Sequence, residues 1–264
     1  MNSLSVNATT HGGITRLGRL SSPPMARRKR RSWLRRAVRL TLVAAFAYLC
    51  WEALTWPRVA ALARAIPETT SFIDRWKTEQ RAAGKSDVPA WRWVPYPAIS
   101  PHLKRAVLVS EDINFFGHHG FEVAEIETAL KDAIDEHGIP RGASTITQQV
   151  AKNLWLSPSR NPLRKVKEAI LTWQLERSLD KKRILEIYLD VAEFGPGIYG
   201  AEAASRHYFG KSAAELDERE AAELAACLPN PGRWNPGGRS AVAVRRTERI
   251  LGRMEKAQFL WKEI

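Results

Sequence analysis

The chain has 264 residues, enough for one large domain or two small ones with ample core-forming residues. Its formal net charge of +13 would suggest a nucleic-acid partner, but ten of the 41 Lys and Arg residues lie within residues 1–39, which hold no Asp or Glu. From residue 40 onward the basic residues exceed the acidic ones by only three. A basic segment before an apolar run is typical of a cytoplasmic flank facing anionic lipid, so we expect a membrane, and no nucleic acid, as a partner.

The apolar run after this basic segment predicts a transmembrane anchor. Residues 40–56 provide 17 mostly apolar positions, the lower limit for crossing a bilayer core of about 30 Å, and Trp51 and Trp56 suit the far interface. Crowded charges at the start of the run disfavour a buried core helix. A cleaved signal peptide is disfavoured because the small residues 61–63 lie too far beyond the run. We expect a basic disordered cytoplasmic tail at 1–39, an uncleaved anchor at 40–56, a helical linker at 57–90 and a catalytic domain at 91–264.

Helix signals dominate the rest of the chain, and no clear alternating strand pattern is present, so the domain is predicted to be mainly α. Cys50 lies in the predicted anchor and Cys227 stands alone beyond it, which predicts neither a disulfide nor a zinc site in the domain. The expected helix starts are Ser100 with Pro101 behind it, Asp180, a capping box from Ser212 to Glu215 that opens a helix through Leu228, and Ser240.

The first candidate site is the segment 111–120, Glu-Asp-Ile-Asn-Phe-Phe-Gly-His-His-Gly. A carboxylate among aromatic rings and histidines can accept and return a proton, as acid/base chemistry on a sugar requires. A Glu-Asp pair alone is more often a solvated acidic turn. The same segment carries Phe115, His118 and Gly120 four, seven and nine residues after Glu111.

The second candidate is the segment 142–153, Gly-Ala-Ser-Thr-Ile-Thr-Gln-Gln-Val-Ala-Lys-Asn. Thr145 and Gln148 form a capping box that predicts a helix start. Thr145, Gln149 and Lys152 share one face of this helix, and such a face suits a diphosphate or a sugar, although any amphipathic helix has a polar face. The residues expected on its buried face are Ile146, Val150 and Leu154.

The third candidate is Arg-Lys-Val-Lys-Glu at 164–168, in a helix expected to be capped by Asn161. Arg164 and Glu168 are four residues apart, and as a simple surface pair they would contribute only about 0.3–0.5 kcal/mol. Arginine binds phosphate through two parallel hydrogen bonds, so Arg160, Arg164 and Lys152 could hold a pyrophosphate. The residues expected to pack inward are Leu163, Val166, Ile170 and Trp173.

In this order, the three segments resemble the motifs of the family-51 glycosyltransferases, the peptidoglycan transglycosylases that polymerise lipid II. The resemblance covers roughly residues 85–255 and includes no transpeptidase domain, so it is closest to the monofunctional biosynthetic enzymes. It implies a mainly α, lysozyme-like domain of two lobes, with a smaller lobe at about 119–141 that dips into the membrane. It also implies a bacterial inner membrane location, with the amino terminus cytoplasmic, the domain periplasmic, and a part in cell-wall synthesis and cell shape.

Two later segments extend the resemblance. Residues 181–189 match a fourth motif that we interpret as structural, in which Glu186 is expected to bond to a neighbouring helix. Asp190 departs from the family, which has Asn at this position, and this puts one side-chain amide donor in doubt. The glycines of 195–204 match a fifth region and permit tight turns beside the cleft.

The resemblance also implies roles for individual residues. Glu111 corresponds to the general base that takes the proton from the 4-hydroxyl of the acceptor lipid II, while the growing strand is transferred from undecaprenyl diphosphate with inversion. Glu168 corresponds to a second essential carboxylate. Mg²⁺ or Mn²⁺ is an optional partner of the diphosphate, no metal site built by the protein is predicted, and cell-division or wall-synthesis proteins are further candidate partners. The implied binding residues are Asp112, Phe115, His118, Thr145, Gln149, Lys152, Arg160 and Arg164.

Two other classes of function remain as alternatives. A lysozyme-like hydrolase would use two carboxylates with water as the nucleophile, and the cationic residues near Glu168 argue against it. A non-enzymatic membrane scaffold would need neither Glu111 nor Glu168.

Overall fold

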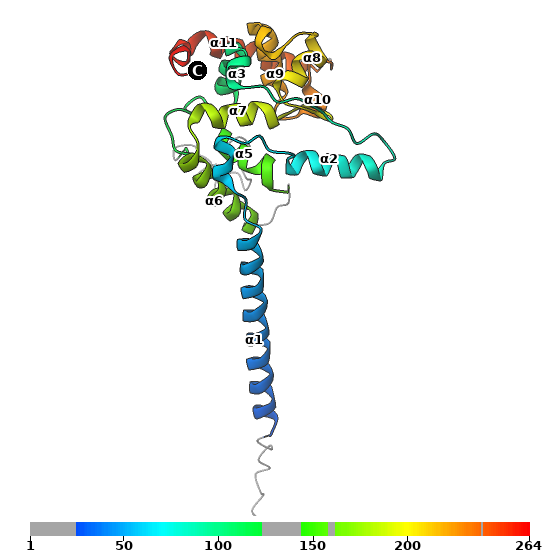
Figure 1. The fold of residues 1–264 in the computed structure, drawn as a ribbon, viewed down its shortest axis with the longest axis vertical. Helices are drawn as coiled ribbons and strands as arrows, with labels where there is room; N and C mark the ends of the chain where they lie inside the picture. Colours follow the sequence, from blue (N-terminus) through cyan, green and yellow to red (C-terminus); the bar gives the residue numbers. More distant parts are fainter. Residues whose placement is uncertain (1–24, 123–143, 158–161, 239) are drawn as a thin grey trace, which may run out of the picture. The chain divides into compact units, whose positions relative to one another are not determined.

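The computed structural model describes residues 25–122, 144–157, 162–238 and 240–264, and it divides into two compact units, Met1–Trp56 and Pro57–Ile264. In the first unit, helix α1 (Met25–Leu54) includes residues 40–54 of the anchor predicted at 40–56 (Figure 1). The prediction of disorder over residues 1–39 is wrong for residues 25–39, which are helical. This segment is rich in Ala, Leu, Arg and Lys, which favour a helix, and the anchor helix continues into it. Residues 1–24 lie outside the described residues.

One stretch among the described residues, Trp33–Ala63, is long and apolar enough to cross a membrane. None of its apolar window is buried within the protein, and large side chains such as Phe46 and Trp51 are more than 60% exposed. This exposure argues against the alternative of a buried core helix.

The second unit is mainly α, as predicted. Its 3₁₀ helices are η1 (Val59–Ala63), η2 (Tyr96–Ala98), η3 (Ala213–Glu215) and η4 (Gln258–Lys262). Its described α-helices are α2 (Ser71–Ala82), α3 (Pro101–Glu111), α5 (Ile146–Trp155), α6 (Pro162–Ser178), α7 (Lys181–Val191), α8 (Ala201–Phe209), α9 (Glu218–Cys227), α10 (Pro231–Trp234) and α11 (Ala241–Lys256). The smaller lobe predicted at 119–141 lies largely outside the described residues.

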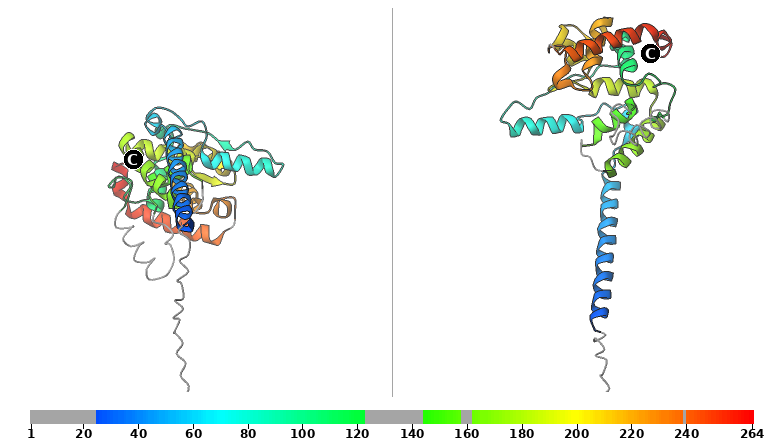
Figure 2. Two further views of the ribbon diagram at one scale, coloured as in Figure 1. Left: turned by 90° about the horizontal axis from the view of Figure 1, so that it is seen from below. Right: turned by 180° about the vertical axis from the view of Figure 1, so that it is seen from behind.

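Two groups of helices lie on either side of α7 (Figures 1 and 2). In one group α3, α9 and α11 pack on one another, and in the other α5 packs on α6 and on α7 itself. The carboxyl end of α3 and the amino end of α5 meet between these groups, where the Asp112 carboxylate accepts a hydrogen bond from the backbone N–H of Ile146. This junction is where the first two sequence motifs come together.

A small sheet accompanies the helices. Strand β1 (Ala90–Trp91) pairs in parallel with β3 (Ile198–Tyr199), which pairs antiparallel with β2 (Glu193–Gly195). The strands are too short to leave an alternating pattern in the sequence. The carbonyl of Asp190 accepts a hydrogen bond from Trp91 Nε1 at 2.8 Å, so α7 holds the segment that carries β1.

The fourth motif also binds this segment. Glu186 accepts hydrogen bonds from Trp93 Nε1 and from Arg183 on its own helix. The prediction that Glu186 bonds to a neighbouring helix is therefore wrong: its long-range partner belongs to the extended chain after β1.

The capping box from Ser212 to Glu215 forms, but it opens only η3. Leu216 is extended, and its carbonyl accepts a hydrogen bond from the Ser100 hydroxyl at 2.7 Å. A second capping box, between Asp217 and Glu220, then opens α9. The predicted single helix through Leu228 is therefore divided in two by a tertiary contact.

Helix α6 faces the opposite way from the prediction. Its apolar residues Leu163, Val166, Ile170 and Trp173 are between 43% and 62% exposed. Its buried face carries Glu168, Leu171, Thr172 and Leu175, none more than 3% exposed. An acidic residue can face inward because Arg164 and Lys165 pair with it.

Candidate active site

Glu111 is the last residue of α3, at the junction of the two helix groups. The helix begins where the Ser100 hydroxyl accepts a hydrogen bond from the backbone N–H of His102, and Leu103, Val107 and Leu108 bury its apolar side completely. The rigid helix thereby fixes the backbone of Glu111. The Glu111 side chain is 13% exposed, so a ligand can still reach its carboxylate.

Three side chains donate hydrogen bonds to the Glu111 carboxylate. Oε1 accepts from the hydroxyl of Ser110 and from Nη2 of Arg246, both at 3.0 Å. Oε2 accepts from Nε2 of Gln149 at 3.1 Å. The carboxylate is therefore held from α3, α5 and α11 at once.

The orientation of Gln149 is fixed in turn by Tyr188. Burial holds the pKa of the Tyr188 phenol well above its usual value, so the hydroxyl keeps its proton and donates to Gln149 Oε1 at 3.2 Å. The amide nitrogen of Gln149 is then the atom that faces Glu111. Gln149 was predicted to bind substrate, and here it contacts the predicted base.

Asp112 joins the first motif to the second. Its Oδ2 accepts from the backbone N–H of Ile146, in the first turn of α5, at 2.9 Å, and a carboxylate is favourable at a helix amino terminus. Its Oδ1 lies 2.9 Å from Nε2 of His118. The backbone N–H of Gly120 donates to Nδ1 of His118 at 3.1 Å, so the ring hydrogen lies on Nε2 and is donated to Asp112.

Phe115 and Thr145 complete this connection. Phe115 is fully buried, and its ring contacts Phe116 and His118 edge to face. The Thr145 hydroxyl caps α5 by accepting from Gln148 N–H, and it donates to the Gly120 carbonyl at 2.7 Å. The capping box and the buried face of α5 are confirmed as predicted.

Gly120 is required at this connection. Its φ is +87°, and a Cβ there would lie 2.8 Å from Cγ2 of Thr172. The last position of the first motif therefore accommodates only glycine. Asp112, Phe115, His118 and Thr145, all predicted to bind substrate, contact the protein itself and hold Glu111 against α5.

A cationic cluster lies on the α5–α6 side. Glu168 is 3% exposed and pairs with Arg164 at 2.9 Å and with Lys165. Burial lowers the pKa of Lys152, while Glu168 and, more weakly, Glu111 raise it. Lys152 is thus within electrostatic reach of both carboxylates. Arg160, the remaining predicted phosphate ligand, lies outside the described residues.

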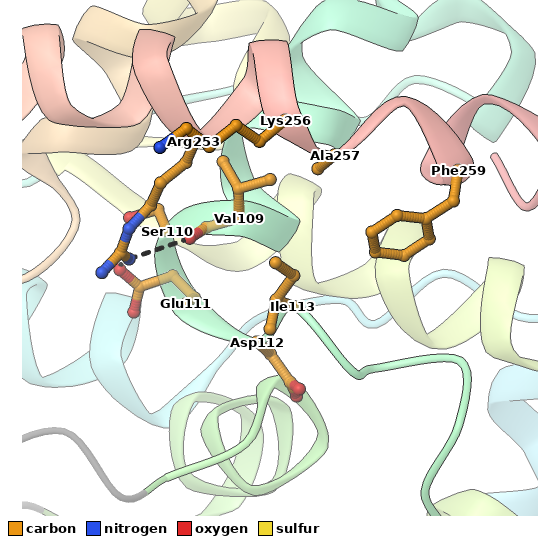
Figure 3. Close-up of a pocket in the computed structure, with 9 residues that line it drawn as sticks. All are labelled: Val109, Ser110, Glu111, Asp112, Ile113, Arg253, Lys256, Ala257 and Phe259. Atoms are coloured by element: carbon orange, nitrogen blue, oxygen red, sulfur yellow. Dashed lines mark hydrogen bonds between the residues drawn. The ribbon is translucent and has the colours of Figure 1, made fainter.

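A cavity of about 560 Å³ opens on the other side of Glu111 (Figure 3). Glu111 faces it together with Arg253, while Asp112 points away from Arg253, and Ile113 and Phe259 form an apolar wall. Its volume suits a sugar-sized ligand. Of the two predicted carboxylates and their cationic neighbours, only Glu111 lines this cavity; Lys152, Arg164 and Glu168 do not.

Three side chains in the described part of the chain, Asp112, His118 and Glu122, lie close enough together to be tested as a metal site, with ligand atoms within 4.8 Å of one another. They do not fit one. Both oxygens of Asp112 and both ring nitrogens of His118 already have protein partners. Glu122 accepts from Nδ2 of Asn114 at 2.6 Å.

Sequence reasoning missed three residues around Glu111: Ser110, Arg246 and Arg253. Lys165 lies within the third candidate segment, but no role was predicted for it. Arg246 lies 135 residues from Glu111, and no local motif marks it. Arg246 and Arg253 are seven residues apart on α11, beside its buried stripe of Thr247, Ile250 and Met254. Two arginines at helical spacing beside a buried stripe are the signal that could have found them.

Buried carboxylates, a cationic cluster and an adjoining cavity define a site for acid/base chemistry on an anionic substrate. A family model described as Transglycosylase matches residues 79–255. A biosynthetic peptidoglycan transglycosylase of Herminiimonas arsenicoxydans is 44% identical over 192 residues, which are 73% of this chain and 83% of that protein. Proteins of the same description are 49% identical over 191 residues in Janthinobacterium sp. (strain Marseille), covering 72% and 83%, and 44% identical over 229 residues in Azoarcus sp. (strain BH72), covering 86% and 96%.

The chain belongs to the transglycosylase family. The predictions of a mainly α transglycosylase domain and of a peptidoglycan glycosyltransferase are thereby confirmed.

Proposed function

We propose that Glu111 is the general base of peptidoglycan strand synthesis and that the cluster around Glu168 stabilises the leaving diphosphate. The observation that carries this proposal is the pair of different environments on the two sides of Glu111. A sugar-sized cavity adjoins Glu111 on the α11 side, and Lys152, Arg164 and Lys165 surround Glu168 on the α5–α6 side.

In the proposed reaction the 4-hydroxyl of the acceptor lipid II attacks the anomeric carbon of the growing strand. The new C–O bond forms as the bond from that carbon to the diphosphate breaks, and attack from the opposite face inverts the configuration. The hydroxyl proton passes to Glu111, and the undecaprenyl diphosphate leaves with the electron pair. Oε2 suits the proton because, among the described residues, Gln149 alone donates to it, whereas Oε1 accepts two hydrogen bonds.

Charge complementarity supports the place of the diphosphate. Arg164 and Lys165 contribute two positive charges to one from Glu168, and Lys152 adds a third. A diphosphate gains charge at the moment it leaves, and fixed cations stabilise it more in the transition state than in the ground state. Mg²⁺ or Mn²⁺ would add to this by bridging phosphate oxygens, with the substrate rather than a protein cage supplying most ligands.

The membrane is the proposed meeting place of enzyme and substrates. The amino-terminal stretch can cross a bilayer by length and composition, and α6 exposes Leu163, Val166 and Trp173, which suit contact with lipid. The basic segment before the anchor supports a cytoplasmic amino terminus and a periplasmic domain at the inner membrane.

Incubation of the full-length protein in detergent with purified lipid II tests the proposal. The intact enzyme is expected to release undecaprenyl diphosphate and to form linear strands, and a lysozyme-like hydrolase would form no polymer. Glu111→Gln should bind lipid II but make no strands. Strand synthesis by this variant at the rate of the unchanged protein would refute the role of Glu111.

A further inference from the structure

The structure assigns to Arg246, acting with Ser110, the task of positioning the Glu111 carboxylate for proton transfer. This inference rests on the proposed function, because it concerns the same base. Three hydrogen bonds, each of 3.0 Å, connect Arg246, Ser110 and Glu111. Arg246 Nη2 donates to Ser110 Oγ and to Glu111 Oε1, and the Ser110 hydroxyl donates to the same Oε1.

Arg246 is held firmly enough for this task. Thr247, Ile250 and Met254 bury one side of α11, which packs on α3 and α9. Two turns further along the same side of α11, Arg253 Nη1 donates to the carbonyl of Val109 at 3.1 Å. Helix α11 therefore fixes both the backbone just before Glu111 and the carboxylate itself.

The geometry leaves one oxygen of Glu111 suited to accept a proton. Only one nitrogen of Arg246 engages the carboxylate, and its Nε is buried without a hydrogen-bond partner among the described residues. A two-pronged arginine pair would occupy both oxygens, and Oε2 could then not receive the acceptor's proton. The single contact saturates Oε1 instead and directs Oε2 toward Gln149.

Arg246 also opposes the pull of the cationic cluster. Lys152 interacts electrostatically with Glu111 from the α5 side, and it is flanked by Arg164 and Lys165. Without Arg246, the carboxylate would move toward Lys152 and pair with a charge needed by the diphosphate. A displacement of about 1 Å in a reacting group is enough to cost about 10²-fold in rate.

The test compares Arg246→Met with Arg245→Met in the full-length protein. Arg245 is the exposed neighbour on the same helix and serves as the matched control. For Arg246→Met we expect kcat for lipid II polymerisation to fall about 100-fold with KM changed less than threefold, since the substrate itself is not contacted. Arg246→Lys, which restores a positive charge and a donor, should have a kcat at least tenfold above that of Arg246→Met. The kcat of Ser110→Ala should lie between that of Arg246→Met and that of the unchanged protein.

Rescue of kcat by added guanidinium ion distinguishes a positioning role of Arg246 from a purely structural one. It should raise the kcat of Arg246→Ala severalfold and leave Arg245→Ala unchanged, with thermal unfolding curves confirming that both variants are folded. If Arg246→Met keeps the kcat of Arg245→Met while Glu111→Gln is inactive, the positioning role is refuted and the base assignment stands. A rise in KM with unchanged kcat would make Arg246 a substrate ligand and overturn the inference. Should Arg246→Met fail to fold, Arg246→Lys and Ser110→Ala decide by the same split between kcat and KM.

Discussion

The two carboxylates of the site are held by cations in different ways. Glu168 pairs with Arg164 and Lys165, which precede it by four and three residues on the same helix. Glu111 pairs with Arg246, 135 residues later on α11, and accepts from Gln149, 38 residues later on α5. The ion pairs of Glu168 can therefore form within α6 alone, whereas the contacts of Glu111 exist only when three helices are packed together.

This difference matches the tasks proposed for the two groups. A diphosphate needs a concentration of positive charge, and a single helix can carry that charge without precise placement. A proton acceptor needs a defined position relative to the attacking oxygen, and contacts from several helices provide it. The site joins a charged surface on one helix group to a positioned base on the other.

The largest expected effect is that of Glu111→Gln. The substitution keeps the shape of the side chain and removes its ability to take a proton, so kcat should fall by about 10³-fold or more. Lipid II binding, measured by equilibrium titration, should change less than threefold. A fall confined to KM would mean that Glu111 binds substrate and takes no proton, and the contrast between the two carboxylates would lose its basis.

Glu168→Gln should have the next largest effect. It removes the buried carboxylate that fixes Arg164 and Lys165 in position, so polymerisation is expected to fall about 10²-fold. Lys165→Met provides the comparison, because the Lys165 side chain is 56% exposed and its pair is screened by water. Its rate should fall less than tenfold. Equal losses in both variants would show that the pair, and not the carboxylate, matters to the reaction.

A pH profile distinguishes the role of Lys152. Burial lowers the pKa of Lys152, so it loses its charge at a less alkaline pH than an exposed lysine, and the rate should decline with that charge as the pH rises. Lys152→Arg keeps a positive charge throughout this range. The variant should therefore retain severalfold more of its own maximum rate on the alkaline side. Superimposable alkaline limbs would remove Lys152 from the set of charges that the diphosphate requires.

Patterns local in sequence predicted much of the fold and part of the site. The capping boxes at Thr145 and Ser212 both form, since their partners are three residues away. The helix after Ser212 is shorter than predicted because Leu216 bonds to Ser100, 116 residues earlier. Tertiary packing, which the local pattern does not contain, decides that boundary.

The same limit explains why the wrong face of α6 was predicted to be buried and why Arg246 on α11 was missed. The spacing of residues along α6 is compatible with burial of either its apolar side or the side that carries Glu168. Which side is buried depends on the cations that pair with Glu168 and on Lys152 from another helix. Arg246 lies in a charged helix with no motif, and its role follows only from its distance to Glu111. Asp112 and Thr145 were predicted to bind substrate, and the sequence alone does not show that they bond the backbone of Ile146 and of Gly120.

The smallest effect on polymerisation is expected for substitution of a third carboxylate, Asp190. This residue tests whether a buried carboxylate without a bonded cation lowers the free energy of unfolding. Asp190 is fully buried, its Oδ1 accepts from the backbone N–H of Val94 at 3.1 Å, and its Oδ2 has no hydrogen-bond partner among the described residues. Burial raises its pKa to about 8 from a usual value of 3.8. Because the folded protein holds this proton more tightly than the unfolded chain, the associated stability is fully present below pH 3.8 and is lost as the pH rises to about 8.

Asp190→Asn keeps the shape of the side chain and the acceptor for Val94, and it removes the titration. Between pH 6 and pH 8 the unchanged protein should therefore lose about 2 kcal/mol of unfolding free energy that the variant retains. Denaturant unfolding of both proteins at the two pH values measures the difference, in which all other titrating groups cancel. Parallel losses in both proteins would mean that Asp190 is ionised in the fold and stabilised there. The contrast between paired and unpaired buried carboxylates would then fail at this position, while the roles of Glu111 and Glu168 would be unaffected, because Asp190 is bonded to the β1 segment and not to either of them.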